Sequence, residues 1–218
     1  MLRSFYQKHR RKIDRVDQFL LGNPILERGL VLAPIVVTCT SISNALVLSG
    51  AFAIITILTI LITYFIPKKL PYTIRVILSA AVAACIFVPL SFWLRERMPE
   101  AVFSLGVYLP LLATNSLVVQ KSESRYHHER LPVMAAQLFT ASLGFAATAL
   151  ATAFVRELFG KGTLFGQPVE WVTRTAPALL MPFGGFILLG FFAALLQKFR
   201  LYLEKQPRKK GRKEDRHA

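Results

Sequence analysis

Cysteine and acidic residues are scarce in this sequence. Its 218 residues include two cysteines, Cys39 and Cys85, and both lie inside apolar runs. Two such cysteines provide neither a disulfide framework nor a Cys-x-x-Cys metal motif. The 12 acidic residues form no nucleophile–base cluster of a soluble active site, and no dinucleotide-binding fingerprint occurs. We therefore expect no catalytic residues, and at most a non-catalytic subunit of an enzyme.

Apolar residues, by contrast, are abundant. They make up 54% of the chain, and the mean hydropathy is +0.46. A soluble domain usually has about 45–50% apolar residues. The charge is concentrated at the two ends, with six basic and two acidic residues in 1–22 and nine basic and three acidic residues in 198–218. Basic segments that flank apolar spans are typical of cytoplasmic juxtamembrane regions and do not require nucleic acid as a partner.

These patterns predict three regions. Residues 1–22 lack the features of a signal peptide and are expected to form a basic amphipathic juxtamembrane arm. Residues 23–197 form a membrane domain, and 198–218 form a basic cytoplasmic tail. A further basic loop, 67–75, lies on the same predicted side as both ends. We expect a multi-pass protein of the cell inner or plasma membrane, in contact with the lipid bilayer, with both termini cytoplasmic and no nucleic-acid partner.

Within the membrane domain, we predict an all-α fold of six segments. Each is close to the roughly 20 residues that cross a bilayer as a helix. Loops 67–71, 95–100, 120–132 and 156–174 connect them. The segments are 29–48, 46–66, 72–94, 101–119, 133–155 and 175–197, and the first and fourth are broken.

The two broken segments resemble each other. With Pro34 aligned to Pro110, PIVVTCT lies over PLLATNS, and Thr38 and Thr40 fall on Thr114 and Ser116. Because each half has an odd number of segments, the two halves must insert with opposite orientations. The sequence thus predicts two inverted three-segment repeats, with Pro34 and Pro110 as the broken-helix prolines.

The polar residues near these prolines have two interpretations. Backbone groups freed by a helix break are tolerated in lipid only where protein or a cavity satisfies them. The polar residues could cap this backbone or line a small polar site near the midplane. Alternatively, the Ser and Thr side chains bond to their own helix and Pro110 makes a kink. The hypothetical midplane lining comprises Thr38, Thr40, Asn44, Thr114, Asn115 and Ser116.

Three stretches carry a family resemblance. NPILERGLVLAPIVVTCTSISNAL (23–46), SLGVYLPLLATNSLVVQKSES (104–124) and RELFGKGTLFG (156–166) resemble the small D/E-type membrane subunits (RnfE/NqrD-like) of the Rnf and Nqr complexes. These complexes are ion-translocating ferredoxin:NAD oxidoreductases and sodium-pumping NADH:quinone oxidoreductases. The resemblance covers roughly residues 20–195 and implies six spans in an inverted repeat. It also implies a homologous partner subunit of opposite topology (RnfA/NqrE-like), alongside other complex subunits.

The resemblance also implies an iron–sulfur centre to which each family member contributes two cysteines. Those family cysteines fall here on Ala33 and Ser116. Iron–sulfur clusters are held mainly by cysteine thiolates. We therefore expect no metal ligands and no cofactor bound by this chain alone, although a partner subunit could hold an iron–sulfur cluster.

Two hypotheses follow. In the first, the chain is a structural, partner-facing subunit of an Rnf/Nqr-like electron-transport complex. In the second, it is a divergent paralogue that uses the scaffold as a transporter or ion-pathway subunit without a redox role. No ionisable residue is central in a predicted segment, which disfavours a carboxylate-based ion site inside the chain. Those near segment ends are Glu27, Arg28, Arg75, Arg156 and Glu157.

Overall fold

The computed structural model describes residues 26, 29, 31–65, 70–115, 118–119, 131–170, 172 and 174–204, and these are predominantly helical. Four helices are long and apolar enough to cross a membrane. They are α4 (Ile42–Thr63), α5 (Tyr72–Arg97), α9 (Leu131–Arg156) and α10 (Pro182–Glu204). A mainly helical multi-pass protein is thereby confirmed, whereas the six-segment inverted repeat stays a prediction. The predicted arm 1–22, the tail from 205 onward and Ser116 lie outside the described residues.

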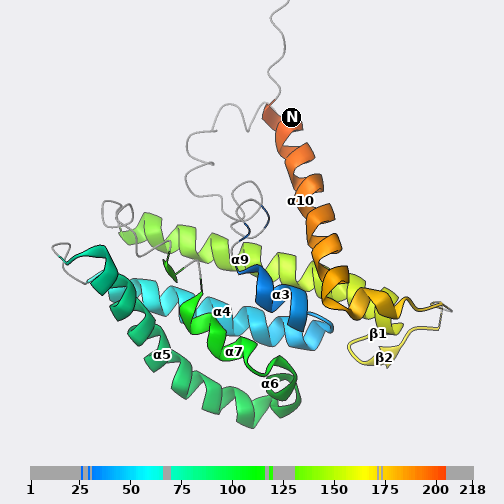
Figure 1. Ribbon diagram of the computed structural model, residues 1–218, viewed down its shortest axis with the longest axis horizontal. Coiled ribbons are helices and arrows are strands. Elements are labelled where there is room, and N and C mark those ends of the chain that lie inside the picture. Colours follow the sequence, from blue (N-terminus) through cyan, green and yellow to red (C-terminus); the bar gives the residue numbers. More distant parts are fainter. Residues whose placement is uncertain are drawn as a thin grey trace, which may run out of the picture.

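Helices α4 and α9 form the centre of the molecule (Figure 1). They run antiparallel, since Ile42 at the start of α4 contacts Glu157 just after α9, while Phe52 stacks on Phe145 with ring centroids 3.9 Å apart. About half of the most apolar window of each helix is buried, 56% in α4 and 50% in α9. This pair is therefore the framework on which the shorter elements are placed.

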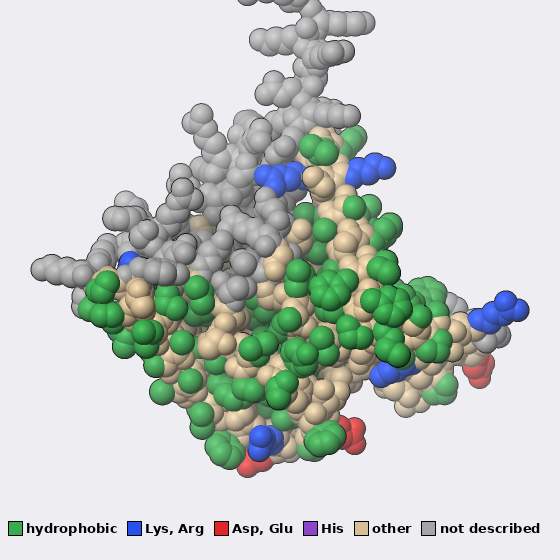
Figure 2. Space-filling model, in the orientation of Figure 1, with side chains coloured by type: hydrophobic (Ala, Val, Ile, Leu, Met, Phe, Trp, Pro, Cys, Tyr) green, Lys and Arg blue, Asp and Glu red, His purple; other side chains and the backbone are tan. Residues whose placement is uncertain are grey.

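Helices α5 and α10 are far less covered. Only 11% of the apolar window of α5 and 17% of that of α10 is buried. Helix α10 rises away from α9 (Figure 1), and apolar side chains spread over the face shown in Figure 2. Large exposed side chains on α10 include Phe183, Phe186, Ile187, Phe191 and Leu195. These surfaces face lipid or other protein chains.

The predicted segment 29–48 contains a break and two separate helices. Helix α3 (Leu32–Thr38) is only seven residues long, and α4 starts at Ile42. Ser41 has an extended backbone, and its hydroxyl oxygen accepts a hydrogen bond from the Asn44 amide, which is N-cap geometry. The predicted start of the second segment at residue 46 is therefore wrong, because this cap begins the helix earlier.

The predicted segment 101–119 is also interrupted. It contains α6 (Pro99–Leu105), α7 (Tyr108–Leu111) and the 3-10 turn η1 (Leu112–Thr114). Gly106, at φ 50°, separates α6 from α7. The predicted loop 95–100 is largely helical, because α5 continues to Arg97 and α6 begins with Pro99, a residue favoured in the first helical turn.

The predicted loop 156–174 has structure of its own. A π-helical turn, η3 (Glu157–Lys161), extends α9 and leads into a hairpin of β1 (Thr163–Leu164) and β2 (Gln167–Pro168). The two strands are antiparallel, and both turn residues between them have positive φ, which suits a tight two-residue hairpin. The predicted span 175–197 divides into the 3-10 turn η4 (Pro177–Leu180) and α10.

Helix α10 attaches to the rest of the molecule through glycine. A Cβ atom built on Gly185 would lie 2.9 Å from the Val36 carbonyl oxygen and 3.2 Å from its Cα in α3. A Cβ on the neighbouring Gly184 would lie 2.8 Å from the Leu179 backbone in η4. Small residues allow such close backbone approach between membrane helices. The start of α10 thus packs directly on the backbone of both α3 and η4.

Gly185→Ala should destabilise the protein. The added methyl group meets backbone rather than a movable side chain, and overpacking of this kind costs about 1–3 kcal/mol. The matched control is Gly190→Ala in the same helix, where an added Cβ meets nothing within 4 Å. Thermal unfolding of the detergent-solubilised protein, followed by tryptophan fluorescence, should show a lower midpoint for Gly185→Ala only. Equal midpoints for the two variants would contradict the close contact.

Candidate functional site at the helix breaks

The break between α3 and α4, residues Cys39–Ser41, exposes backbone groups at two helix ends. The last carbonyls of α3 and the first amides of α4 have no partner within their own helices. At membrane depth such groups must be satisfied by protein or a water-filled cavity. We call this region the first break. Its backbone carbonyls and amides form hydrogen bonds with side chains from other parts of the chain.

Arg156, the last residue of α9, donates hydrogen bonds to backbone carbonyl groups at the end of α3, on one side of the first break. Its side chain is fully buried, with 0% exposure. One terminal nitrogen, Nη1, donates to the carbonyl oxygens of Val36 at 2.7 Å and Cys39 at 3.3 Å. A guanidinium at the C-terminal end of a helix also interacts favourably with the helix dipole. Arg156 therefore caps α3 from a position more than a hundred residues away in sequence.

The same guanidinium caps a second short element. Its Nε donates to the Leu179 carbonyl oxygen at 2.8 Å. Its Nη2 donates to Leu180 at 2.6 Å and Met181 at 3.4 Å, at the end of η4. Arginine has five N–H donors in a fixed planar arrangement, which suits several acceptors around one position. Arg156 thus joins the ends of α9, α3 and η4.

Glu157 accepts a hydrogen bond from the backbone amide at the start of α4, on the other side of the first break. Its Oε2 accepts a hydrogen bond from the Ile42 amide at 2.6 Å, and its Oε1 accepts one from the Gly166 amide at 3.0 Å. The side chain is 2% exposed. A carboxylate at the start of α4 is also favoured by the helix dipole. Two adjacent residues of opposite charge therefore cap the two opposite helix ends at one break.

The predicted polar residues near the first break bond to its backbone and to α6. The side-chain nitrogen Nδ2 of Asn44 donates to the Ser104 hydroxyl at 2.8 Å and to the Thr38 carbonyl oxygen at 3.4 Å. Thr38 is buried, and its hydroxyl donates to the Pro34 carbonyl oxygen at 2.6 Å. Thr40 is partly buried, and its amide donates to the Thr38 carbonyl oxygen at 2.8 Å. Pro34 lies inside α3, and the break follows it by several residues.

A second break follows η1, and Asn115 satisfies it. The Asn115 side-chain oxygen accepts from the Val118 amide at 2.8 Å, and its nitrogen donates to the Leu112 carbonyl oxygen at 2.7 Å. The same nitrogen donates to the Thr56 hydroxyl in α4 at 3.3 Å. Asn115 is thus the capping residue of the second break.

Unlike the buried Asn115, the nearby residues Thr114 and Pro110 are exposed. Thr114 is exposed, and its hydroxyl donates to the Leu111 carbonyl oxygen at 3.4 Å. Pro110 lies exposed in α7, between the Gly106 turn and the second break. Ser116 lies outside the described residues.

The structure brings the polar residues together as two groups. One group lies at the first break, where Asn44 in the first turn of α4 bonds to Thr38. The other lies at the second break, where Asn115 bonds to Thr56 of α4. At 1.5 Å per residue, these two positions are roughly 18 Å apart along the helix axis. Within the described residues, most hydrogen bonds of both groups go to backbone. The Asn44 and Asn115 side chains bond to backbone at the helix breaks, whereas the Thr38 and Thr114 hydroxyls bond to carbonyls of their own turns.

A polar cavity of about 710 Å³ lies beside the first break. Residues from the break, the α5–α6 junction and the β-hairpin line it. Its charged and hydrogen-bonding side chains include Thr40, Ser41, Asn44, Ser104, Glu157 and Lys161. Small cavities of this kind at broken helices are typical of binding sites in membrane transporters.

Neither cysteine belongs to a metal cluster in the described part of the chain. Cys39 is fully buried in the first break, and Cys85 is exposed on α5. Ala33, where the resemblance expects a cysteine, is exposed on α3. Among the described residues, no group of three or more His, Cys, Asp or Glu side chains could hold a metal ion.

Comparison with known protein families shows to which family the chain belongs. Residues 15–193 match the family described as "Rnf-Nqr subunit, membrane protein". The chain belongs to the Rnf-Nqr family. This match covers both helix breaks and most of the four long helices.

Several relatives of this Rnf-Nqr chain are named components of larger complexes. It is 26% identical over 188 residues to the D subunit of the Na(+)-translocating NADH-quinone reductase of Pseudoalteromonas translucida, covering 83% of this chain and 89% of the relative. It is 30% identical over 192 residues to the E subunit of the ion-translocating oxidoreductase complex of Shewanella frigidimarina, covering 80% and 81%. It is 27% identical over 214 residues to the D subunit of the Shewanella denitrificans reductase, covering 91% and 99%. The Rnf-Nqr chain is therefore similar to the D and E subunits of these two types of complex.

Sequence reasoning missed the capping roles of Arg156 and Glu157 in this Rnf-Nqr protein. It placed both near a segment end and gave neither a role, whereas both are buried. A signal was available, since the pair interrupts a long apolar run and opens the RELFGKGTLFG stretch on which the resemblance rests. Because the partners of the pair at the first break are more than a hundred residues away in sequence, the pattern alone did not identify what the pair contacts there.

Proposed function

We propose that this chain is an integral membrane subunit of an Rnf/Nqr-like ion-translocating electron-transport complex. In this role it is structural, faces a partner subunit and supplies no iron–sulfur ligand. The match over residues 15–193, together with the names of the relatives, carries the proposal. The large exposed apolar side chains of α5 and α10 support it, because they leave these helices free to pack against other chains in a membrane.

The partner is a homologous membrane subunit of opposite topology, RnfA/NqrE-like, alongside other subunits of the complex. An iron–sulfur cluster in the membrane would be held by cysteines of that partner. The basic ends of this chain support a cytoplasmic location for both termini. The residues Ala33 and Ser116 support the absence of ligands here, since alanine has no donor atom and serine is a poor substitute for a thiolate.

The proposal is tested by purifying the tagged chain with whatever binds it in its native membrane. The co-purifying proteins are identified by mass spectrometry, and iron and acid-labile sulfide are measured per complex. We expect a cysteine-bearing sister subunit and a membrane-embedded iron–sulfur centre. A Cys39→Ser/Cys85→Ser variant should keep the iron content unchanged, whereas cysteine substitutions in the sister subunit should abolish the membrane centre. Loss of iron from the Cys39→Ser/Cys85→Ser variant would refute the absence of ligands in this chain.

A second candidate function rests on the polar cavity at the first break. Its hydroxyl, amide and carboxylate groups support a transporter or ion-pathway subunit with no redox role. The same purification separates the two functions. A stable complex whose companion also lacks cysteines and whose core holds no iron would favour transport over electron transfer.

A further inference from the structure

A second cavity, of about 720 Å³, lies between α5 and the α6–α7 region. Its walls are mainly apolar, with Phe87 from α5, Val102 from α6 and Leu109 from α7. The volume falls within the roughly 300–1,000 Å³ of typical ligand pockets. We call this cavity the α5–α7 groove. It is separate from the polar cavity beside the first break, although Pro99 lines both.

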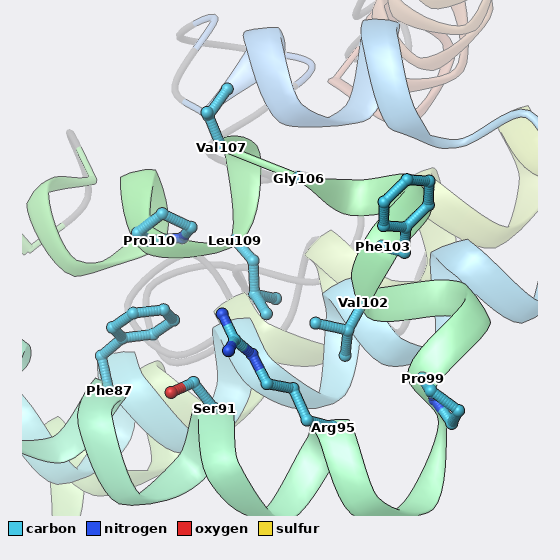
Figure 3. Close-up of a pocket in the computed structure, with 10 residues that line it drawn as sticks. All are labelled: Phe87, Ser91, Arg95, Pro99, Val102, Phe103, Gly106, Val107, Leu109 and Pro110. Carbon is cyan, nitrogen blue, oxygen red and sulfur yellow. The ribbon is translucent and has the colours of Figure 1, made fainter.

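One cation faces this apolar groove. Figure 3 shows Arg95 extending from α5 into the cavity, with its guanidinium pointing toward Leu109. Of the ten residues that line the groove, Arg95 is the only one with a charge, and none is acidic. Ser91, one helical turn before Arg95, adds a hydroxyl group whose hydrogen goes to the Val88 carbonyl oxygen at 2.7 Å. The groove therefore combines a single positive charge with an apolar interior.

The place of Arg95 along α5 sets its depth in the membrane. The 26 residues of α5 extend for about 39 Å at 1.5 Å per residue, longer than the ~30 Å hydrocarbon core. Arg95 is in the last turn of this helix. Trp93, 53% exposed, lies nearby with the Arg97 guanidinium 5.9 Å from its ring centroid. Aromatic and basic residues of this kind are typical of the membrane–water interface, where lipid phosphates lie.

The groove is also open to its surroundings. Phe103 and Val107, which line its edge, are 91% and 76% exposed, and α5 itself is mostly uncovered. A molecule could thus enter from the bilayer without any rearrangement of the fold. Its chemistry must match one cation at headgroup depth and apolar walls toward the membrane interior.

We propose that the α5–α7 groove binds an acidic phospholipid of the surrounding bilayer. Arg95 binds the headgroup phosphate, for which a guanidinium offers two parallel donors. One acyl chain lies along Phe87, Val102 and Leu109. The negative charge of the lipid is complementary to Arg95, and no acidic side chain is among the described residues that line the groove.

Native mass spectrometry of the purified full-length chain in neutral detergent tests whether the α5–α7 groove binds an acidic phospholipid. The protein is titrated separately with phosphatidylglycerol and phosphatidylcholine that carry the same acyl chains. The first phosphatidylglycerol should bind roughly tenfold more tightly than phosphatidylcholine, a difference of about 1.4 kcal/mol. Both lipids offer a phosphate to Arg95, but the quaternary ammonium of phosphatidylcholine cancels its charge and would lie near the guanidinium. Arg95→Ala should remove this preference. It should leave the unfolding midpoint unchanged, because Arg95 is exposed.

Two further variants separate the groove from general surface charge. Arg97→Ala removes a cation in the same helical turn that does not line the groove, and it should keep the preference. Val102→Trp fills the groove while leaving Arg95 in place, and it should prevent tight binding of the first lipid. Equal loss of preference in Arg95→Ala and Arg97→Ala would overturn the proposal, as would unchanged binding to Val102→Trp at an unchanged unfolding midpoint.

A last measurement distinguishes a lipid from a protein partner in this groove. Phe103→Cys, made in a Cys85→Ser background because Cys85 is also exposed, places a thiol at the exposed edge of the groove. Maleimide labelling of this thiol is compared between the isolated chain and the complex purified from native membrane. Accessibility in both, with phosphatidylglycerol retained, is the expected result. Protection in the complex without retained phosphatidylglycerol would show that a partner subunit fills the groove and would overturn the proposal. Neither outcome depends on whether the complex contains iron.

Discussion

Arg156→Met should cause a large loss of stability. The substitution introduces an apolar side chain of similar length and removes the guanidinium donors to the carbonyls of Val36, Cys39, Leu179 and Leu180. The Met181 carbonyl keeps the amides of Gly184 and Gly185 as donors. A buried polar group left without a partner costs about 1–3 kcal/mol, so the total should be on the order of 5 kcal/mol. We expect little folded protein in membranes and a strongly lowered unfolding midpoint in detergent, measured by fluorescence-detected size exclusion after heating.

Two comparisons make the Arg156 result specific. Arg156→Lys keeps the charge but has only three donors, so its stability should fall between the wild type and Arg156→Met. Arg97→Met removes an exposed arginine and should have little effect, since exposed charges contribute little. If Arg156→Met unfolds at the same temperature as Arg97→Met, the guanidinium does not cap the first break.

Glu157→Ala should produce the second large effect. It leaves the buried Ile42 amide without its acceptor and frees the Gly166 amide in the hairpin. The orphaned Ile42 donor should cost about 1–3 kcal/mol. Gly166 is exposed, so its amide can bond to water instead and adds little to this cost. Because Ile42 begins α4, the first turn of that helix should lose protection. Hydrogen–deuterium exchange of peptides covering residues 39–48, together with the unfolding midpoint, measures both effects.

Glu157→Gln and Glu100→Ala are the matched controls. Glutamine retains one side-chain acceptor oxygen, so Glu157→Gln should lose one of the two hydrogen bonds and destabilise less than Glu157→Ala. Glu100 is an exposed carboxylate that lines the same polar cavity, and its removal should leave exchange at the start of α4 unchanged. Faster exchange in Glu100→Ala, equal to that in Glu157→Ala, would contradict a specific role for Glu157.

Much of the helical framework could be predicted because it depends on local sequence. The apolar runs that form α5, α9 and α10 are long enough to identify from hydropathy alone. The boundary of α4 was missed because the apolar run continues through the break, while the cap is a single residue, Ser41. A single N-cap serine has little weight against a long apolar pattern, although it determines where the helix begins.

The contents of the candidate site were harder to predict. Thr38, Asn44 and Asn115 were identified from the concentration of polar residues near Pro34 and Pro110. Their partners were not, because Asn44 bonds to Ser104 and Asn115 to Thr56, each about sixty residues away. Arg156 and Glu157 were placed at a segment end because hydropathy measures only where apolar runs stop. It does not register that η3, η4 and α3 enclose this end of α9.

The distance in sequence between the first break and its caps has a consequence for synthesis of the protein. Ile42 bonds to Glu157, 115 residues later, and Val36 bonds to Arg156, 120 residues later. Helices α3 and α4 therefore leave the ribosome and enter the membrane with their break uncapped. It can be closed only after α9 has inserted, and η4 and the start of α10 complete the arrangement. A chain that stops before residue 156 keeps the Ile42 amide and the Val36 carbonyl without these partners, a defect that quality-control proteases could recognise.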